Sequence, residues 1–496
     1  MSAELAPSSM GRDGQGGGGL SLAVASDSAW ADVDGGMEDP EEIRVIFCAL
    51  DSFSQYAKVA HFNVTHLRRR SFYALPQAHW QLLAAPPFNF LDTLDKADAA
   101  IDSNAVLARA ILKSGLASFS SFSSPTAAAA TTTTTTSSSP PHPPPSSSAA
   151  DVAMPYEWAG IAKFSDIDKA RSTIRQFYRD WSAAGAAERA ASYGPVLAAL
   201  EQEAALREAA HHDNPTTTPS TAAPPPTNNG DAAPSAPAAA PSDPRLKVLV
   251  PGAGLGRLVF ELCLAGHHAE GNEISYHQLL ASSYILNDCP AADHHAIYPW
   301  IHTFSNHLLR DHHLRAYPVP DVHPATALAA AAASSPRGAG SMAMCAADFL
   351  CLYADAAHAD AYDAVASVFF LDTAPNLLRY LEVLFHCLRP GGLLVNLGPL
   401  LWHFENNAPG NHGHDDDGDG EHDLNSSSGI ADPGSFELSN DEVLALVEKV
   451  GFVVERMETG IDAPYIQDRE SMLQTVYKAT FWVARKPLSA SVDQSA

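Results

Sequence analysis

The stretch "LKVLVPGAGLGRLVFEL", residues 246–262, decides the fold of this chain. An aliphatic run breaks at three glycines and resumes as a helical pattern. This predicts a strand, a tight loop and a helix, the arrangement that holds a nucleotide. The glycines stand at positions 252, 254 and 256, whereas the dinucleotide fingerprint G-x-G-x-x-G needs one at 257, where this chain has Arg257. The spacing therefore favours a nucleoside ligand over NAD.

Short aliphatic runs and helical patterns alternate through the C-terminal half of the chain. The runs are "KVLVPGAG", "HAEGNE", "SMAMCAADF", "YDAVASVFFLDT", "GGLLVNLG" and "ATFWVARKP". Alternation of this kind predicts an α/β fold, a mostly parallel Rossmann-like sheet with helices on both faces. Ligands of such sheets bind at the carboxyl ends of the strands, so candidate functional residues are sought there.

Changes in composition divide the chain. Segments rich in Gly, Ser, Thr, Pro or Ala lack the large aliphatic side chains that offset the entropy of ordering. We expect disorder at 1–40, 117–152 and 211–244, and a tail at 488–496. We expect a helical N-terminal region at 41–116, helices covering the ligand site at 153–210, and the sheet domain at 245–487. Two surface insertions, at 324–341 and 406–432, show neither the alternation nor the helical stripe of a core element.

Charge and cysteine usage exclude several classes of function. The formal net charge of −27 argues against binding to nucleic acid or to an anionic membrane. The sequence has no apolar run of about twenty residues that would span a bilayer. The six cysteines are scattered without a C-x-x-C pair, which favours a reduced, cytoplasmic setting. Six histidines lie between positions 294 and 313, but without an H-E-x-x-H motif or Cys or Asp partners we expect no metal site.

Four sequence features follow one another at characteristic intervals. After the glycine loop, Glu273 closes the second strand, where a carboxylate can accept hydrogen bonds from both ribose hydroxyls. Asp348 and Phe349 close the third strand, where an acid can contact an adenine amine while the ring covers its face. A Pro-Gly-Gly turn then precedes the strand in "LRPGGLLVNLG". Together these features resemble the class I S-adenosylmethionine-dependent methyltransferases.

Longer strings resemble one family more closely. They are "RSTIRQFYRDWSAAGAAER", "GNEISYHQLLASSYILN", "FFLDTAPNLLRYLEVLFHCLRPGG", "VNLGPLLWHFEN" and "APYIQDRESMLQTVYKATFWVARKP". They are similar to the carnosine N-methyltransferase family, with "IRQFYRDWS" and "NLGPLLWHFEN" the most specific. The resemblance is weak over 42–115, strong over 160–208 and 246–487, and absent from the low-complexity tracts. It implies a seven-stranded Rossmann-like sheet with an N-terminal helical subdomain.

The resemblance also implies a binding site for S-adenosylmethionine. Gln176 and Arg179 would reach over the cofactor, with Arg179 pairing with its methionine carboxylate. Ala364 would make a contact through its backbone, at a position where the family often has cysteine. The remaining cofactor positions are Gly252 and Gly254 for close approach, Glu273 for the ribose, and Asp348 with Phe349 for the adenine.

The family's substrate contacts fall on Asp372, His403, Tyr465 and Tyr477. Only the imidazole nitrogen that lacks hydrogen can attack a sulfonium methyl. A carboxylate accepting from the far N–H would select that tautomer and stabilise the developing imidazolium, and we assign this catalytic role to Asp372. His403 would orient the ring or relay its proton, and the tyrosines would bind the polar ends of the peptide. The transfer is a direct in-line displacement governed by positioning.

Each assignment has a structural alternative. Asp372 precedes a helix and could serve as its N-cap, a role open to Thr373 as well. His403 could be a core histidine and the two tyrosines packing residues. Arg179 could pair with Asp180 or another acid on a solvated face.

The resemblance therefore implies a methyltransferase that converts carnosine to anserine on the imidazole ring. The alternative enzyme activity is methylation of other histidine peptides or of a histidine in a protein. The alternative without enzyme activity is a scaffold that kept the cofactor fold. We expect a histidine-containing peptide as the small-molecule partner, a homodimer by resemblance to the family, and a location in the cytoplasm, with the nucleus as a further site.

Overall fold

The computed structural model describes residues 40–122, 158–212, 245–405 and 434–488. The segments expected to be disordered, the tail and the 406–432 insertion lie outside these residues, apart from their margins. At two margins the expectation is wrong, because α4 continues to Phe122 and α6 to His212. No proline stands at 117–122 or 211–212 to interrupt either helix, so the helices extend beyond the change in composition.

A seven-stranded sheet forms the centre of the fold, in the order β5-β2-β1-β6-β7-β9-β8. Neighbouring strands are parallel except that β9 runs antiparallel to both β7 and β8. The strands are β1 (Lys247–Pro251), β2 (His268–Glu273), β5 (Met342–Ala346), β6 (Tyr362–Val368), β7 (Leu388–Gly398), β8 (Val453–Pro464) and β9 (Val476–Arg485). This confirms the predicted Rossmann-like sheet. The sequence analysis missed β8, an edge strand whose residues are mostly exposed and lack an apolar run.

Helices cover both faces of the sheet, as predicted. On one face α6 (Ala186–His212) packs against β6, β7 and β8, and α7 (Arg257–Leu264) packs against β2 and β5. On the other face α11 (Phe349–Tyr353), α12 (Leu377–Cys387) and α13 (Asn440–Val450) share a second apolar cluster with the sheet.

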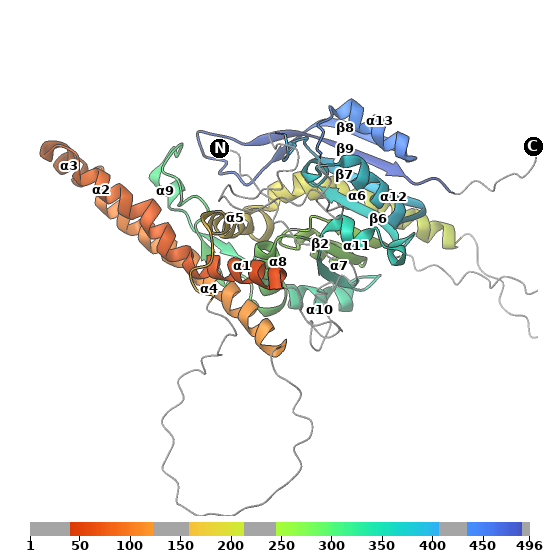
Figure 1. The fold of residues 1–496 in the computed structure, drawn as a ribbon, viewed down its shortest axis with the longest axis horizontal. Coiled ribbons are helices and arrows are strands. Elements are labelled where there is room, and N and C mark those ends of the chain that lie inside the picture. Colours follow the sequence, from red (N-terminus) through yellow and green to blue (C-terminus); the bar gives the residue numbers. More distant parts are fainter. Residues whose placement is uncertain (1–39, 123–157, 213–244, 406–433, 489–496) are drawn as a thin grey trace, which may run out of the picture.

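The N-terminal helices form a long arm that projects from the sheet domain, with α3 at its far end (Figure 1). The arm comprises α1 (Pro40–Ala60), a π-helical turn (His61–His66), α2 (Leu67–Tyr73), α3 (Gln77–Ala84) and α4 (Phe90–Phe122). Helix α5 (Phe164–Trp181) contacts α1 and α4 of the arm as well as α8 (Tyr276–Ser283) of the sheet domain. One face of α5 is thereby placed over the carboxyl ends of the strands.

Smaller elements complete the sheet domain. A π-helical turn (Tyr284–Asp288) extends α8, and short 3₁₀ turns lie at Ala356–His358 and Leu371–Thr373. A second, two-stranded sheet pairs β3 (His295–Ile297) with β4 (Tyr317–Val319), and α9 (Arg310–His313) lies between them in sequence.

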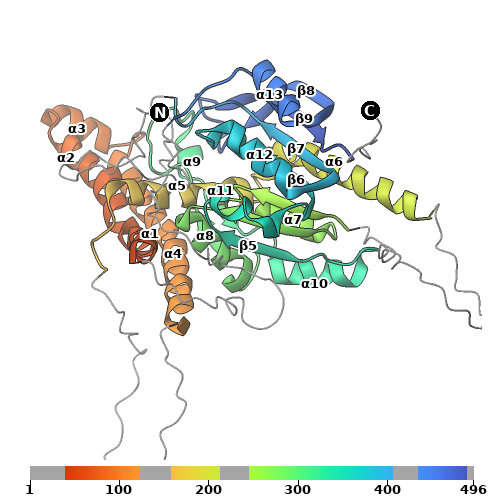
Figure 2. The same cartoon turned by 45° about the vertical axis from the view of Figure 1, so that its right-hand side comes forward.

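The 324–341 insertion contains a helix that the sequence analysis did not predict. Residues 324–334 of the 324–341 insertion form helix α10 (Pro324–Ser334), which packs against α7 below the β5 edge of the sheet (Figure 2). Its alanines have high intrinsic helix propensity, and Pro324 suits the first turn. A helix without an amphipathic stripe escapes a search for periodicity.

Candidate active site

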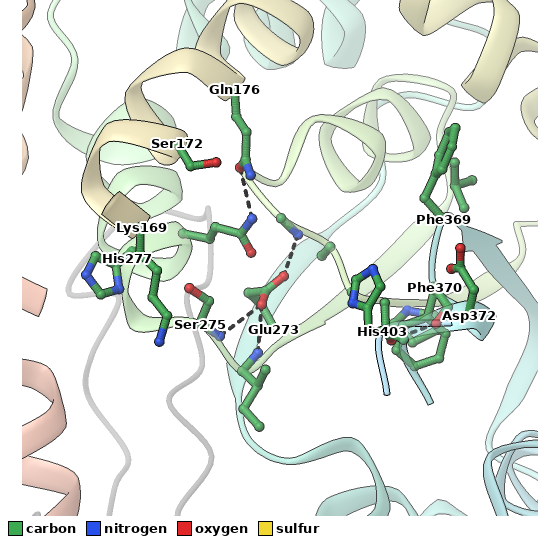
Figure 3. Close-up of a pocket in the computed structure, with 18 of the residues that line it drawn as sticks. Lys169, Ser172, Gln176, Glu273, Ser275, His277, Phe369, Phe370, Asp372 and His403 are labelled. Carbon is green, nitrogen blue, oxygen red and sulfur yellow. Dashed lines mark hydrogen bonds between the residues drawn. The ribbon is translucent and has the colours of Figure 1, made fainter. Parts of the chain in front are cut away.

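The carboxyl ends of β1, β2, β5 and β6 open into a cavity of about 650 Å³ (Figure 3). The chain order of the strands reverses between β1 and β6, the position where open α/β sheets bind ligands. All but one of the predicted site residues line this cavity: Gln176, Arg179, Gly252, Gly254, Glu273, Asp348, Phe349, Asp372, His403, Tyr465 and Tyr477. Figure 3 shows Glu273 and Asp372 in separate parts of the cavity, called here the Glu273 end and the Asp372 end.

The glycine loop lies at the Glu273 end. Gly252, Gly254 and Gly256 have φ angles of 66°, 59° and 74°, a left-handed conformation that favours glycine. A Cβ at Gly252 would lie 2.9 Å from Cδ2 of Phe370, whereas a Cβ at Gly254 would meet nothing within 4 Å. The loop therefore presents backbone to open cavity space at Gly254, as close approach to a ligand requires.

Glu273 is held by three backbone donors. Gly254 N–H donates to its Oε2 at 2.8 Å, and the N–H groups of Ile274 and Ser275 donate to its Oε1 at 2.9 Å each. Burial raises the pKa of Glu273, and these donors oppose that shift. The carboxylate is thus fixed in position between the glycine loop and α8, as a ribose ligand would need.

Gln278 links Glu273 to Gln176 on α5. With its NH₂ group turned toward the carboxylate, Gln278 donates to Glu273 Oε2 at 3.0 Å and accepts from Gln176 Nε2 at 3.0 Å. In the opposite orientation it donates to Gln176 Oε1 at 2.9 Å. The first orientation satisfies the buried carboxylate and is the one we adopt. The sequence analysis did not single out Gln278.

Asp348 and Phe349 lie at the start of α11. Asp348 caps this helix, accepting from Cys351 N–H at 2.9 Å. Phe349 packs edge-on against Phe370, with ring centroids 5.4 Å apart. Both side chains line the cavity and also serve the local fold, and the adenine contacts stay a prediction.

Arg179 lines the cavity and also pairs with its neighbour. Its Nε and Nη2 atoms donate to the two carboxylate oxygens of Asp180 at 2.8 and 2.9 Å. The sequence analysis gave this ion pair as the alternative to a cofactor contact, and the pair is present. It does not lie on a solvated face, because Asp180 is only 1% exposed. The guanidinium also lies 5.4 Å from the ring centroid of Tyr465.

Ala364 is the predicted site residue that the structure does not place on the cavity. It is fully buried within β6, paired with Val248 on one side and Leu393 on the other. The residues of β6 and its C-terminal extension that reach the cavity are Val368, Phe369 and Phe370. The position transferred from the family therefore lies too far back along the strand to touch a ligand.

Asp372 follows β6 in a 3₁₀ turn and is 4% exposed. Its Oδ2 accepts from Leu401 N–H at 2.9 Å, and burial raises its pKa to about 6. Helix α12 begins at Leu377, and its N-cap is Asn376, which accepts from Arg379 N–H at 3.3 Å. The alternative that Asp372 caps this helix is therefore wrong.

His403 follows β7 and lines the Asp372 end of the cavity. Its backbone N–H donates to the backbone carbonyl of Asp372 at 3.2 Å. Burial lowers the pKa of its imidazole, so the ring is neutral at neutral pH. The half-buried ring borders the cavity and is not a fully buried core histidine.

Three aromatic rings meet at the Asp372 end. Phe369, Tyr465 and Tyr477 have ring centroids separated by 5.3, 5.9 and 6.1 Å. Burial, together with the charges of Tyr465 and Asp372, raises the pKa of Tyr477. The tyrosines pack on each other, as the packing alternative expects, and they also line the cavity, so their role in binding stays a prediction.

Two residues at this end have left-handed backbones. Phe369 has a φ of 51° and Ile466 a φ of 43°, which is unusual for a bulky and for a β-branched side chain. Sequence reasoning missed both, because no glycine marks the turns. Strained backbone of this kind is common at ligand-binding sites.

Sequence reasoning also missed Glu188, a buried acid on α6. Its carboxylate accepts from Ile466 N–H at 2.8 Å and from Gln467 N–H at 3.1 Å.

The cavity suits the predicted cofactor. The left-handed glycine loop leaves open space at Gly254, and the fixed carboxylate of Glu273 can accept hydrogen bonds from sugar hydroxyls. Within the described ranges, no three His, Cys, Asp or Glu side chains are grouped so as to hold a metal ion. None of the helices in the described parts of the chain is long and apolar enough to cross a bilayer.

Comparisons with known proteins show which family the chain resembles. A family model described as carnosine N-methyltransferase matches residues 156–220 and 235–488. The carnosine N-methyltransferase of Schizosaccharomyces pombe is 30% identical, over 90% of this chain and 97% of that protein. The protein of the same name from Rattus norvegicus is 32% identical over 65% of this chain, which spans 64% of the rat protein. A solved S-adenosylmethionine-dependent methyltransferase from Methanosarcina mazei is 14% identical with a TM-score of 0.26, over 49% of this chain and 93% of that one.

Proposed function

The chain belongs to the carnosine N-methyltransferase family, and on that basis we propose that it methylates an imidazole nitrogen of a histidine-containing dipeptide, with S-adenosylmethionine as the methyl donor. The named reaction is carnosine to anserine. The observation that carries this proposal is the buried carboxylate of Asp372, which lines the same cavity as the glycine loop and Glu273.

The Glu273 end is the proposed cofactor site. When bound there, S-adenosylmethionine supplies a methyl group made electrophilic by its sulfonium sulfur. Glu273 holds the ribose hydroxyls, Asp348 and Phe349 contact the adenine, and Gln176 and Arg179 cover the ligand from α5. Arg179 gives two of its five N–H groups to Asp180, and the remaining donors suit a carboxylate.

The Asp372 end is the proposed acceptor site. Asp372 accepts a hydrogen bond from one imidazole N–H, which leaves the lone pair of the other nitrogen free to attack the methyl carbon. As the N–C bond forms, the C–S bond breaks and its electron pair stays on sulfur, so that S-adenosylhomocysteine leaves. The ring becomes an imidazolium, whose charge Asp372 stabilises and whose N–H proton it can take.

His403, Tyr465 and Tyr477 are proposed to position the ring and the polar ends of the peptide. The neutral imidazole of His403 can donate or accept one hydrogen bond, so it can orient the acceptor or relay its proton. The rings of Tyr465, Tyr477 and Phe369 exclude water and present π faces toward a ring that gains positive charge.

The proposal is tested by mass spectrometry. The purified full chain is incubated with methyl-labelled cofactor and a panel of histidine di- and tripeptides that includes carnosine, alongside Asp372→Ala. Label on the imidazole ring, absent with the variant, is the expected result. Cofactor binding without label on any peptide would reject the dipeptide substrate and favour a protein histidine. A chain that shows no thermal shift with cofactor would be a scaffold, since a ligand at about 100 times its dissociation constant stabilises by about 2.7 kcal/mol.

Homodimer formation and a cytoplasmic or nuclear location stay predictions. They are checked by light scattering of the purified chain and by imaging of the tagged protein in its cell.

A further inference from the structure

Two arginines one helical turn apart on α5 line the cavity, and they differ in whether a carboxylate pairs with them. Arg179 forms a bidentate pair with the buried carboxylate of Asp180. Arg175 donates from Nη2 to the backbone carbonyl of Ile466 at 2.6 Å, and its guanidinium lies 5.2 Å from the ring centroid of Trp300. Within the described ranges, no carboxylate forms a salt bridge with Arg175. The cavity therefore contains a guanidinium without a counter-ion.

The acid whose charge acts on Arg175 is already engaged. The charge of Glu188 acts on Arg175, but both oxygens of Glu188 accept from backbone N–H groups, those of Ile466 and Gln467. Burial and the neighbouring Arg171 lower the pKa of Arg175, and a guanidinium nevertheless stays protonated. Arg175 is exposed to solvent where it borders the cavity, so an anionic ligand can reach it, and its fork of N–H donors matches a carboxylate.

The location of Arg175 selects which end of the cavity such an anion would occupy. Its hydrogen-bond partner Ile466 directly follows Tyr465, which packs against Phe369 and Tyr477 at the Asp372 end. Lys169, six residues earlier on α5, also lines the cavity, but Figure 3 shows it near Ser275 at the Glu273 end. Arg175 is therefore the cation of α5 that borders the acceptor site without an acidic partner.

We propose that Arg175 binds the α-carboxylate of the acceptor and restricts the enzyme to peptides in which histidine is the C-terminal residue. This inference rests on the proposed function, in which Asp372 holds the imidazole. Histidine at a C-terminus carries a carboxylate on the same residue as its ring, so one end of that residue meets Asp372 and the other meets Arg175. A histidine inside a protein chain has a neutral amide there, which can accept a hydrogen bond but offers no charge to the guanidinium.

The test compares carnosine with its C-terminal amide as acceptors for the purified full chain. Charged hydrogen bonds are roughly twice as strong as neutral ones, so we expect kcat/KM for the acid to exceed that for the amide by about 10- to 100-fold. In Arg175→Gln, kcat/KM for the acid should fall by a similar factor through KM, to the level of the amide. The KM for S-adenosylmethionine should not change, and Arg175→Lys should recover part of the preference.

Arg171→Gln is the matched control, because Arg171 lies on the same helix, pairs with exposed Asp168 and does not line the cavity. An acid-to-amide preference that persists in Arg175→Gln would overturn the inference. A rise in the KM for S-adenosylmethionine alone would also overturn it, by assigning Arg175 to the cofactor's carboxylate. Equal methylation of acid and amide by the unmodified chain refutes this inference and leaves the proposed function standing. If the chain binds the cofactor but methylates neither the acid nor the amide, both this inference and the proposed function are refuted. The comparison of acid and amide uses the unmodified chain, so it is informative even if Arg175→Gln fails to fold.

Discussion

The backbone N–H of His403 donates to the backbone carbonyl of Asp372 at 3.2 Å, so the chain after β7 is tied to the turn after β6. The side chain of Asp372 adds a second link by accepting from Leu401 N–H at 2.9 Å. Because the first link is made by main-chain atoms, it does not depend on either side chain. The roles of Asp372 and His403 can therefore be separated by substitution.

Replacing Asp372 by asparagine should reduce activity strongly. The amide can still accept a hydrogen bond from Leu401 N–H, so the turn is kept, but it has no charge to stabilise an imidazolium. Loss of one such electrostatic contact costs about 100- to 1000-fold in kcat. Steady-state kinetics with carnosine measures this, and a variant with kcat within a factor of about three of the unmodified chain would remove Asp372 from the mechanism.

The same substitution should stabilise the protein at neutral pH. Burial raises the pKa of Asp372 from 3.8 to about 6, so its contribution to stability is present below pH 3.8 and is lost as pH rises through 6. The ionised carboxylate at about pH 7.5 therefore costs about 3 kcal/mol, which Asp372→Asn avoids, and at about pH 4.5 the gain should shrink to about 1 kcal/mol. Urea unfolding at the two pH values tests the sign, and equal gains at both would contradict a raised pKa of Asp372 in the folded state.

Catalytic efficiency should fall as pH falls through about 6, because Asp372 must be ionised to accept the imidazole N–H. The acceptor ring, with an ordinary pKa of about 6.5, protonates in the same range and adds a second step to the acid limb. A peptide whose histidine carries a fluorinated, weakly basic ring removes the second step. With that acceptor, the logarithm of kcat/KM should still rise with a slope of one on the acid side of the pH profile. A flat profile there would show that ionisation of Asp372 is not required.

The residues predicted from pattern alone, without the family resemblance, are those whose place follows from one strand and its loop. The glycines, Glu273 and Asp348 each stand at the end of a predicted strand, and parallel strands bring such ends to one edge of the sheet. Ala364 was wrongly assigned a cofactor contact. The assignment was transferred from the family, and such a transfer does not show where the strand that carries the residue ends. Asp372 was found, but whether it caps a helix depended on where α12 begins, which a sequence fixes only loosely.

The residues missed from sequence act across long separations. Glu188 and Ile466 are 278 positions apart, and nothing near either residue signals their hydrogen bond. The turns at Phe369 and Ile466 lack the glycine that usually marks a left-handed backbone. Arg175 was passed over because an arginine on an amphipathic helix is ordinary, and only the positions of surrounding acids show that it has no salt-bridge partner among the described residues.

Replacing Glu273 by glutamine should weaken cofactor binding. The amide can accept from only one side, so some of the three backbone donors lose their partner, and the ribose loses a charged acceptor. We expect the Kd for S-adenosylmethionine to rise by about 10- to 100-fold, as for loss of a charged hydrogen bond. Calorimetry measures this, with Glu455→Gln on the exposed face of β8 as control. An unchanged Kd would contradict the ribose assignment.

Two glycine substitutions should separate strain from steric contact. Gly254→Ala meets no neighbour within 4 Å, so it carries only the strain of a left-handed φ, about 1 kcal/mol. Gly252→Ala has similar strain and adds a contact of 2.9 Å with Phe370, so its unfolding free energy should fall by about 1–3 kcal/mol more. Chemical unfolding compares the two variants. Equal losses would mean that Phe370 moves aside without cost.

Glu188 should act as a positioning residue for Tyr465, without contact to substrate or cofactor. Its carboxylate accepts from the N–H groups of Ile466 and Gln467, and so holds Ile466 in a left-handed backbone that costs about 1–3 kcal/mol. In Glu188→Gln an amide NH₂ faces one of these donors, so the strained turn relaxes and Tyr465 leaves its place. We expect the KM for the peptide to rise about 10-fold while the Kd for S-adenosylmethionine stays the same.

Glu201→Gln is the control for Glu188→Gln, since Glu201 lies on the same helix and pairs with Arg337 at the surface. The decisive comparison is between Glu188→Gln alone and Glu188→Gln combined with a substitution of Ile466, the residue with the strained backbone. Ile466→Gly accepts the left-handed backbone freely, so combining it with Glu188→Gln should restore part of the peptide affinity, although it removes a buried side chain and lowers stability by about 2–5 kcal/mol. If glycine restores nothing, Glu188 acts on the acceptor by its charge and not by holding the turn.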